Sequence, residues 1–149
     1  MAASTPTLVK MTDPPSLGPG HPVFSHITTV PFGPNLNFIT IAGQPALPPP
    51  KSSEPHPKIP RGLRAQIELC LSRVSTCLEA SGAKVTDMTR LMYYFTERAW
   101  EEEDALKLVV EVVGKWLGGH RPASCLLVVK GLSQPEFLCE FEAQAVVQR

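Results

Sequence analysis

Two stretches near the C-terminus decide the fold of this 149-residue chain: Gly119-His120-Arg121-Pro122-Ala123-Ser124-Cys125 and Cys139-Glu140-Phe141-Glu142-Ala143. The first stretch leads into an apolar run that predicts a strand over residues 125–130. The second stretch lies within an apolar run that predicts a strand over residues 137–147. Residues two apart on a strand share a face, so Glu140 and Glu142 lie together on an otherwise apolar strand. Buried carboxylates are costly unless they are paired, so this strand is predicted to line a polar site or an interface.

The preceding residues predict further strands separated by two helices. Runs rich in β-branched and aromatic residues predict strands over 24–30, 37–42 and 85–96. Apolar residues at helical spacing predict helices over 62–80 and 100–117. The second helix carries an acidic run at its predicted N-terminus, where the helix dipole favours anions. Its buried stripe is expected to consist of Leu106, Val109, Val110, Val113 and Leu117.

This order, β-β-α-β-α-β-β, predicts an α+β fold with one mixed sheet and two helices on one face. The other sheet face is left bare, with apolar residues beside the two glutamates, so we expect an oligomer that covers it. A single domain is predicted over residues 23–149, after a flexible Pro-rich segment at 1–22. The Pro-rich loop at 45–60 is either a tolerated surface insertion or a lid over a site.

Composition narrows the class of protein. Lys and Arg equal Asp and Glu in number, so the net charge is zero, which argues against nucleic-acid and anionic-membrane partners. No stretch is long and apolar enough to span a bilayer, and a cytoplasmic location is expected.

The four cysteines lack zinc-site spacing, so no metal is expected and reduced, mostly buried thiols are favoured. Cys125, where a strand begins, is the alternative candidate as a nucleophile or site-lining residue.

Several motifs, in their order and spacing, resemble those of the Rid family, the YjgF-like reactive-intermediate deaminases formerly called L-PSP endoribonucleases. The resemblance covers about residues 23–147. The matching segments are Phe24-Ser25-His26, Ile39-Thr40-Ile41-Ala42-Gly43-Gln44, Gln66 with Leu78-Glu79-Ala80-Ser81-Gly82-Ala83, Asp87-Met88, Pro122-Ala123-Ser124-Cys125 and Glu140-Phe141-Glu142-Ala143.

The resemblance implies a chorismate-mutase-like fold and a homotrimer whose sheets form a central barrel with clefts between subunits. It implies hydrolysis of enamines and imines of 2-amino acids to 2-keto acids and ammonia, without a metal or an organic cofactor. Glu140 would position or activate water, and a backbone amide near Gly43 would contact the ligand. The substrate-binding candidates are Phe24, His26, Gly43, Arg121, Ala123 and Cys125.

The chain also departs from the family pattern. Ala123 stands where an arginine binds the substrate carboxylate, Phe24 replaces a tyrosine, and Ala42 replaces a serine. Losing a bidentate, charge-assisted contact costs roughly 1.5–3 kcal/mol. Arg121 either substitutes for the missing arginine or is a solvated rim residue.

These departures predict an altered substrate: a less acidic, more apolar imine, enamine or reactive carbonyl compound of a specialised pathway, such as secondary metabolism. Glu140 would be the general base, because burial beside apolar residues raises a carboxyl pKa. For His26, a structural role at a strand end is an equal alternative, and Glu142 is read mainly as structural.

A non-catalytic small-molecule-binding or interaction protein is the alternative function. Ribonuclease action is disfavoured by the neutral charge.

Overall fold

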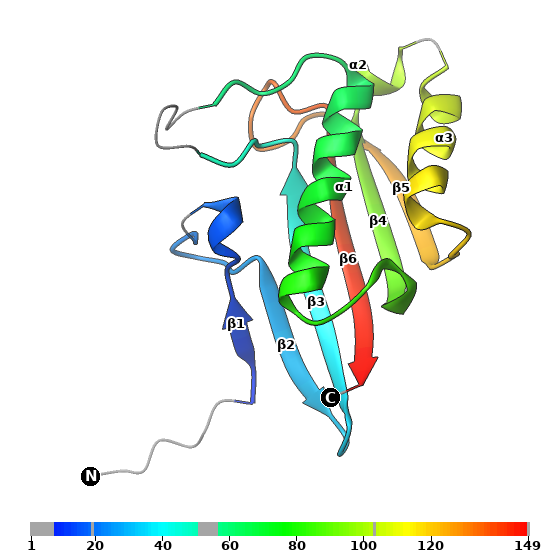
Figure 1. Cartoon of the computed structure of the whole chain (residues 1–149). Helices are drawn as coiled ribbons and strands as arrows, with labels where there is room; N and C mark the ends of the chain where they lie inside the picture. Colours follow the sequence, from blue (N-terminus) through cyan, green and yellow to red (C-terminus); the bar gives the residue numbers. More distant parts are fainter. Residues whose placement is uncertain (1–7, 19, 51–56, 103, 149) are drawn as a thin grey trace.

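A six-stranded mixed sheet with helices on one face forms the body of the protein (Figure 1). The computed structural model describes residues 8–18, 20–50, 57–102 and 104–148. The strands lie in the order β1-β2-β3-β6-β4-β5. The chain is therefore an α+β protein, as the sequence predicts.

The elements follow the predicted order, with a short strand added at the start and the second helix divided in two. Their bounds are β1 Lys10–Thr12, η1 Pro15–Leu17, β2 Ile27–Phe32, β3 Leu36–Pro45, α1 Leu63–Ala80, η2 Val85–Asp87, β4 Met88–Thr96, α2 Glu97–Trp100, α3 Ala105–Leu117, β5 Ala123–Val129 and β6 Cys139–Gln148.

The last strand in the chain is central in the sheet. β6 runs antiparallel to both β3 and β4, and β4 pairs with β5 in parallel. The parallel pair requires a crossover connection, which α2 and α3 supply between β4 and β5. Because β6 lies between the N-terminal hairpin and the β4-β5 pair, its side chains meet residues from both halves of the chain.

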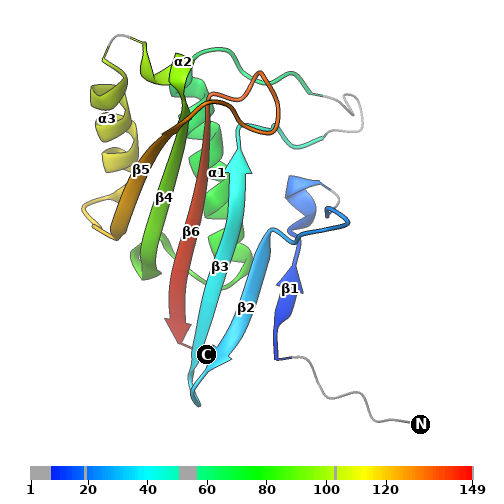
Figure 2. The same cartoon turned by 180° about the vertical axis from the view of Figure 1, so that it is seen from behind.

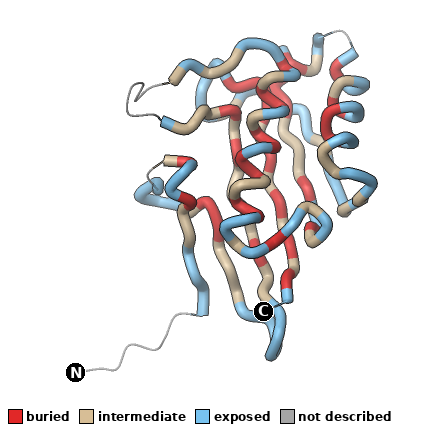
Figure 3. The backbone as a smooth tube through the Cα atoms, viewed as in Figure 1, coloured by how far each residue is buried: buried red, intermediate tan, exposed pale blue. Residues whose placement is uncertain are grey.

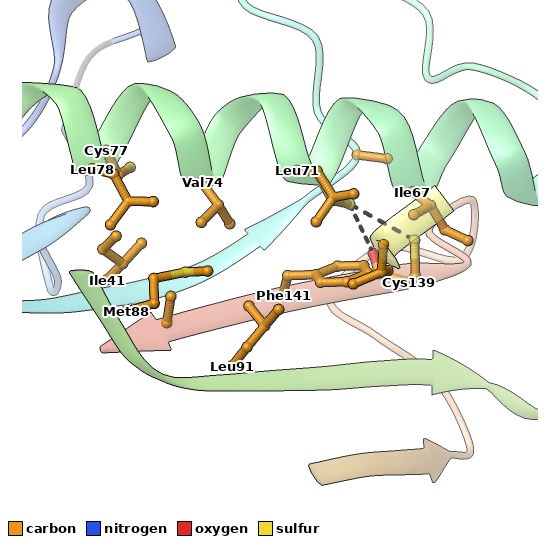
Figure 4. Close-up of a cluster of buried hydrophobic side chains, with 14 of the residues drawn as sticks. Ile41, Ile67, Leu71, Val74, Cys77, Leu78, Met88, Leu91, Cys139 and Phe141 are labelled. Atoms are coloured by element: carbon orange, nitrogen blue, oxygen red, sulfur yellow. Dashed lines mark hydrogen bonds between the residues drawn. The ribbon is translucent and has the colours of Figure 1, made fainter. Parts of the chain in front are cut away.

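Helix α1 packs across β3 and β6 and against α3. Ile67, Leu71, Val74 and Leu78 recur at helical spacing on its buried face. They cover inward-facing strand residues such as Phe141, which is fully buried (Figure 4). Figure 3 shows these buried segments concentrated between the helices and the sheet. Helix α1 ends before Gly82, which has φ 76°, and the Ala83 N–H donates to the Leu78 oxygen at 2.8 Å.

The predicted helix over 100–117 is wrong in its boundary and in its buried stripe. Asp104 adopts a left-handed conformation with φ 62°, which separates α2 from α3 and leaves most of the acidic run outside a helix. Val109 and Val113 of the predicted stripe are buried, but Leu106 and Val110 are 58% and 65% exposed, and Ala105 and Val112 are buried in their place. The helix is apolar on most of its circumference, so its residue pattern is compatible with more than one buried face.

The first part of the chain also differs from the prediction. Within the segment assigned to a flexible tail, residues 10–12 form β1 at the sheet edge, antiparallel to β2. Leu17 is buried against the core, and the backbone N–H of His26 donates to Asp13 Oδ1 at 2.8 Å. Residues 1–7 of this segment, and residues 51–56 of the Pro-rich loop, lie outside the described residues.

The face of the sheet opposite the helices is open. Figure 2 views the sheet from this side, and no described helix crosses it. The register places Arg90, Met92 and Tyr94 of β4 beside Ala123, Cys125 and Leu127 of β5. Leu127 is 43% exposed there. The bare face predicted from the sequence is therefore present in the single chain.

Candidate functional site

The two glutamates of β6 lie on the open face. Along β6, buried and half-buried residues alternate strictly from Cys139 to Val147, and Glu140 and Glu142 belong to the half-buried set. Cys139, Phe141 and Ala143 belong to the buried set that packs under α1. The strand alternation inferred from the sequence is thus confirmed for this pair.

A bulge in β3 brings Gly43 against Glu140. The β3-β6 register shifts between Ile41 and Gln44, so Ala42 and Gly43 together lie opposite Glu142. A Cβ atom built on Gly43 would lie 1.7 Å from Glu140 Oε1 and 2.8 Å from its Cδ. The absence of a side chain at position 43 therefore leaves the space that the Glu140 carboxylate occupies.

This environment changes the proton affinity of Glu140. Burial raises the pKa of the carboxyl group above its ordinary value of 4.5, and the negative charge of Glu142 raises it further. A carboxylate with a raised pKa is a stronger base when it is ionised. Glu140 therefore has the electrostatic setting of a general base or of a group that orients water.

Glu142 is held by a neighbouring phenol. The hydroxyl of Tyr94, on β4, donates a hydrogen bond to Glu142 Oε1. This bond is the main cause that raises the Tyr94 pKa to about 12; burial and the charges of both glutamates add to it. Tyr94 was not singled out as functional from the sequence; in the structure it shares the open face of β4 with Arg90 and Met92.

Behind the bulge, His26 and Gln44 form a buried polar pair. Gln44 Nε2 lies 3.2 Å from His26 Nδ1 and donates to the Ala42 oxygen at 2.9 Å. The Ala42 N–H in turn donates to the His26 oxygen at 2.9 Å. Burial, together with the charge of Arg73, lowers the His26 pKa below its ordinary value. These contacts support the Ala42-Gly43 backbone from the side that faces the core.

Phe24 precedes β2 and is 48% exposed. Its ring stacks on His21 with centroids 4.4 Å apart and meets the His26 ring edge-on at 6.3 Å. Of the residues predicted for substrate contact, Phe24 and His26 are thus neighbours of each other. Neither has a described contact with Glu140.

The predicted residues of the β5 region form a separate group. Ala123 and Cys125 lie on the open face of β5, and Arg121 is exposed in the connection before it. Because β4 lies between β5 and β6, these residues stand two strands away from Glu140, on the order of 10 Å laterally. A single copy of the chain therefore holds Gly43 with Glu140 but does not bring the β5 group to them.

A small hollow on the open face connects β3, β6 and β4. Its volume is about 270 Å³, and it is lined by Thr40, Arg90, Met92, Tyr94, Glu142, Ala143 and Gln144. A wider hollow of about 550 Å³ lies at the N-terminal end of α1, and none of the residues predicted for the site lines it. Glu142 lines the hollow on the open face, whereas Glu140 and Gly43 are not among its lining residues.

No group of three His, Cys, Asp or Glu side chains among the described residues is arranged to hold a metal ion. Within the same part of the chain, no helix is long and apolar enough to cross a membrane. Of the four thiols, Cys70, Cys77 and Cys139 are buried and Cys125 is exposed.

The family model described as Endoribonuclease L-PSP matches residues 30–147, which include the bulge and both glutamates. The chain belongs to the Rid, or YjgF-like, family. No curated protein sequence matches it.

Solved structures of this family share its fold. YyfA of the Rid family, from Yersinia pestis, is 14% identical with a TM-score of 0.75, covering 93% of this chain and 99% of its own. A YjgF-family protein from Mycobacterium tuberculosis is 24% identical with a TM-score of 0.67, covering 93% and 99%. Escherichia coli TdcF, solved with bound serine, is 22% identical with a TM-score of 0.70, covering 93% and 98%.

Proposed function

We propose that this protein is a Rid-like small-molecule enzyme that adds water to an imine, an enamine or a reactive carbonyl compound. One observation carries the proposal: the Glu140 carboxylate, its pKa raised by burial and by Glu142, rests against a glycine bulge on an open sheet face. A carboxylate in such a setting is suited to take a proton from water.

In the proposed reaction, Glu140 orients a water molecule and accepts its proton as the oxygen attacks the carbon of the C=N bond. Glu140 then returns the proton to the nitrogen of the carbinolamine, whose C–N bond breaks to release ammonia and leave a carbonyl product, so that the net change is R₂C=NH + H₂O → R₂C=O + NH₃ and the carboxylate is regenerated. The family resemblance assigns a ligand contact to the backbone N–H near Gly43. That contact would stabilise negative charge developing beside the bulge.

A homotrimer would complete the site. Three copies joined through their open faces would form a barrel, and the β5 group of one copy could then meet the Gly43-Glu140 pair of another. Exposed Leu127 on this face favours such a contact. A cytoplasmic location and a role in a specialised pathway are parts of the same proposal. The serine bound to E. coli TdcF supports a small molecule as the ligand of this fold.

The test is ammonia release from enamines generated in situ, with more apolar enamines compared against 2-aminoacrylate, the usual substrate of the family. Because this chain is not expected to be a standard 2-aminoacrylate deaminase, we expect the wild type to accelerate ammonia release above the spontaneous rate, and more strongly with the apolar enamines than with 2-aminoacrylate. Glu140→Ala should reduce that acceleration by about 10²–10⁴-fold, the usual contribution of a general base. The matched control Glu136→Ala changes an exposed glutamate just before β6. If wild type and Glu140→Ala both show only the background rate, 2-aminoacrylate deamination is excluded.

A non-catalytic binding or interaction protein of the same fold is the second candidate. The observation that favours it is the joint replacement of family polar groups by Phe24, Ala42 and Ala123. Ligand-induced increases in melting temperature without turnover would support this candidate. Ribonuclease action, suggested by the family description, is disfavoured by the zero net charge.

A further inference from the structure

A fully buried glutamine lies directly after the bulge that carries Gly43. Gln44 is 0% exposed, and its Nε2 donates to the Ala42 oxygen at 2.9 Å. Its Oε1 has no hydrogen-bond partner among the described residues. A buried amide is costly when part of its hydrogen-bonding capacity is unused. The Gln44 amide therefore serves only as a donor, and one of its two contacts is with the backbone of the bulge.

The Ala42 contact fixes the direction of the Gly43 N–H. The Ala42 carbonyl and the Gly43 N–H belong to one peptide unit, and no cis peptide bond occurs among the described residues. In a planar trans unit these two groups point in opposite directions. The carbonyl is directed at Gln44 and His26, on the β2 side of β3, so the N–H is directed toward β6, the strand that carries Glu140.

The His26 ring fixes the amide of Gln44 in turn. The amide nitrogen has two hydrogens: one is donated to the Ala42 oxygen, and the other faces His26 Nδ1 at 3.2 Å. Because an amide nitrogen does not accept, Nδ1 is the acceptor and the ring proton lies on Nε2. A proton on Nδ1 would set two donors against each other. Reversing the amide would set its oxygen against the Ala42 oxygen.

The surroundings keep the His26 ring in the neutral form that this contact needs. Burial and the positive charge of Arg73 lower the His26 pKa below its ordinary value of 6.5, outweighing the opposite effect of Asp13. The ring is therefore neutral at pH 7, and its Nδ1 lone pair is available to Gln44.

We propose that Gln44 is a positioning residue of the reaction and that His26, in its Nε2–H tautomer, orients Gln44. By holding the Ala42 carbonyl, Gln44 aims the Gly43 N–H at the side of the bulge where Glu140 lies. This inference deepens the proposed function and rests on it, because that N–H is the group proposed to stabilise developing negative charge. It also places His26, a candidate for substrate contact from the sequence, behind the bulge instead.

The first measurement is steady-state ammonia release by full-chain variants. Gln44→Leu keeps the approximate volume of the side chain and removes both donors. We expect kcat to fall about 10–100-fold, as for a displaced transition-state donor, while KM changes much less. The melting temperature should stay close to that of the wild type, because a buried unpaired oxygen is removed as well. Gln134→Leu, at an exposed position before β6, is the matched control and should keep the wild-type rate.

A pair of His26 variants separates orientation from packing. His26→Leu removes the acceptor, whereas His26→Gln offers an amide oxygen in its place. We expect His26→Leu to lower kcat about tenfold and His26→Gln to recover most of that loss. A ring that served only to fill space would be replaced at least as well by leucine.

The second measurement does not depend on turnover. It is NMR spectroscopy at pH 7 of the full chain labelled with ¹⁵N-histidine and ¹⁵N-glycine. His26 should show a protonated Nε2 and an unprotonated Nδ1. The Gly43 amide signal should shift in Gln44→Leu and in His26→Leu, and far less in Gln134→Leu.

The inference is overturned if His26 carries its proton on Nδ1, or if the Gly43 signal ignores Gln44→Leu. If Gln44→Leu does not fold, equal losses of rate in His26→Leu and His26→Gln would overturn it. A Gln44→Leu chain with the wild-type kcat, in a protein whose turnover requires Glu140, would refute this inference alone. The expected NMR signals in a wild-type chain that releases no ammonia would refute the proposed reaction and leave Gln44 as the residue that orients the peptide.

Discussion

Gly43 is the residue at which the fold makes room for the proposed base. The Cβ of an alanine there would overlap Glu140 Oε1, at 1.7 Å, whereas the Glu140 Cγ would be 3.2 Å away. The overlapping atom is the end of a flexible side chain, so the backbone can keep its path while the carboxylate is displaced. Filling this space should therefore lower the reaction rate and leave the stability of the fold largely unchanged.

We predict that Gly43→Ala lowers enamine hydrolysis roughly a hundredfold while the melting temperature stays close to that of the wild type, because a misplaced catalytic group costs rate steeply. Steady-state ammonia release and thermal melting measure the two effects. Gly114→Ala is the matched control: its Cβ meets nothing within 4 Å in α3, so it should preserve the rate and add up to about 1 kcal/mol of stability. A large fall in melting temperature with an unchanged rate for Gly43→Ala would contradict the prediction.

Glu140 should also make stability depend on pH. Burial and Glu142 raise its pKa above 4.5 in the folded chain, so the folded state holds the proton more tightly than the unfolded state does. Its contribution to stability is therefore present at low pH and is lost as the pH rises through the raised pKa. Replacing it with a neutral amide removes that loss.

We predict that Glu140→Gln melts at a higher temperature than the wild type at pH 7–8, and that the difference disappears near pH 4. Calorimetric melting across this range is the measurement. Glu68→Gln, on the exposed side of α1, serves as the control and should show no such trend. A wild-type chain that gains stability relative to Glu140→Gln as the pH rises would reverse the sign and refute the assignment.

At the scale of elements, one side chain of α1 joins the helix to the segments that lead into the site. Gln66 is 2% exposed, and its Nε2 donates to the oxygens of Pro60 and Glu136, each at 2.9 Å. Its Oε1 accepts from the Leu138 N–H at 2.8 Å. Leu138 lies two residues before Glu140, so Gln66 fixes the backbone from which the proposed base projects.

Gln66→Leu preserves approximate volume and removes all three hydrogen bonds. We predict a loss of about 2–4 kcal/mol of unfolding free energy, because the buried Leu138 N–H and the part-buried oxygens of Pro60 and Glu136 lose their partner. The measurement is urea denaturation, with Thr76→Ala as the control on the same helix, where only an exposed bond to the Ser72 oxygen is lost. A Gln66→Leu chain as stable as the control would show that Gln66 does not hold these segments.

Sequence periodicity predicted most elements because α1 and β6 each have one strongly apolar face. It succeeded only in part for α3: Lys107, Glu111 and Lys115 mark one polar side, but the apolar residues Leu106 and Val110 are exposed instead of buried. It missed β1, whose residues Lys10–Thr12 are too few to show alternation. Local pattern also placed Glu140 and Glu142 on one face. The pairing of Arg90 with Ala123 depends on the register of strands far apart in the chain, which a local pattern does not contain.

At the scale of the whole molecule, the open face of the sheet is not covered by any helix of the described residues. Helices cover one side of the sheet, and the other side carries the proposed site together with exposed Leu127 (Figure 2). The β5 group and Glu140 stand two strands apart in one copy, so an inter-subunit contact is the arrangement that would unite them. Association through this face is therefore tied to activity in the proposed function.

We predict a trimer of roughly 49 kDa, three times the 16.2 kDa chain, in light scattering coupled to size-exclusion chromatography. Leu127→Lys should shift the mass toward 16.2 kDa and abolish ammonia release together, because it places a charge in the contact. Leu106→Lys, at an equally apolar and 58% exposed position on the helical side, should change neither property. A wild-type monomer that releases ammonia, or a Leu127→Lys monomer with full activity, would show that one copy suffices and that the β5 group takes no part in the reaction.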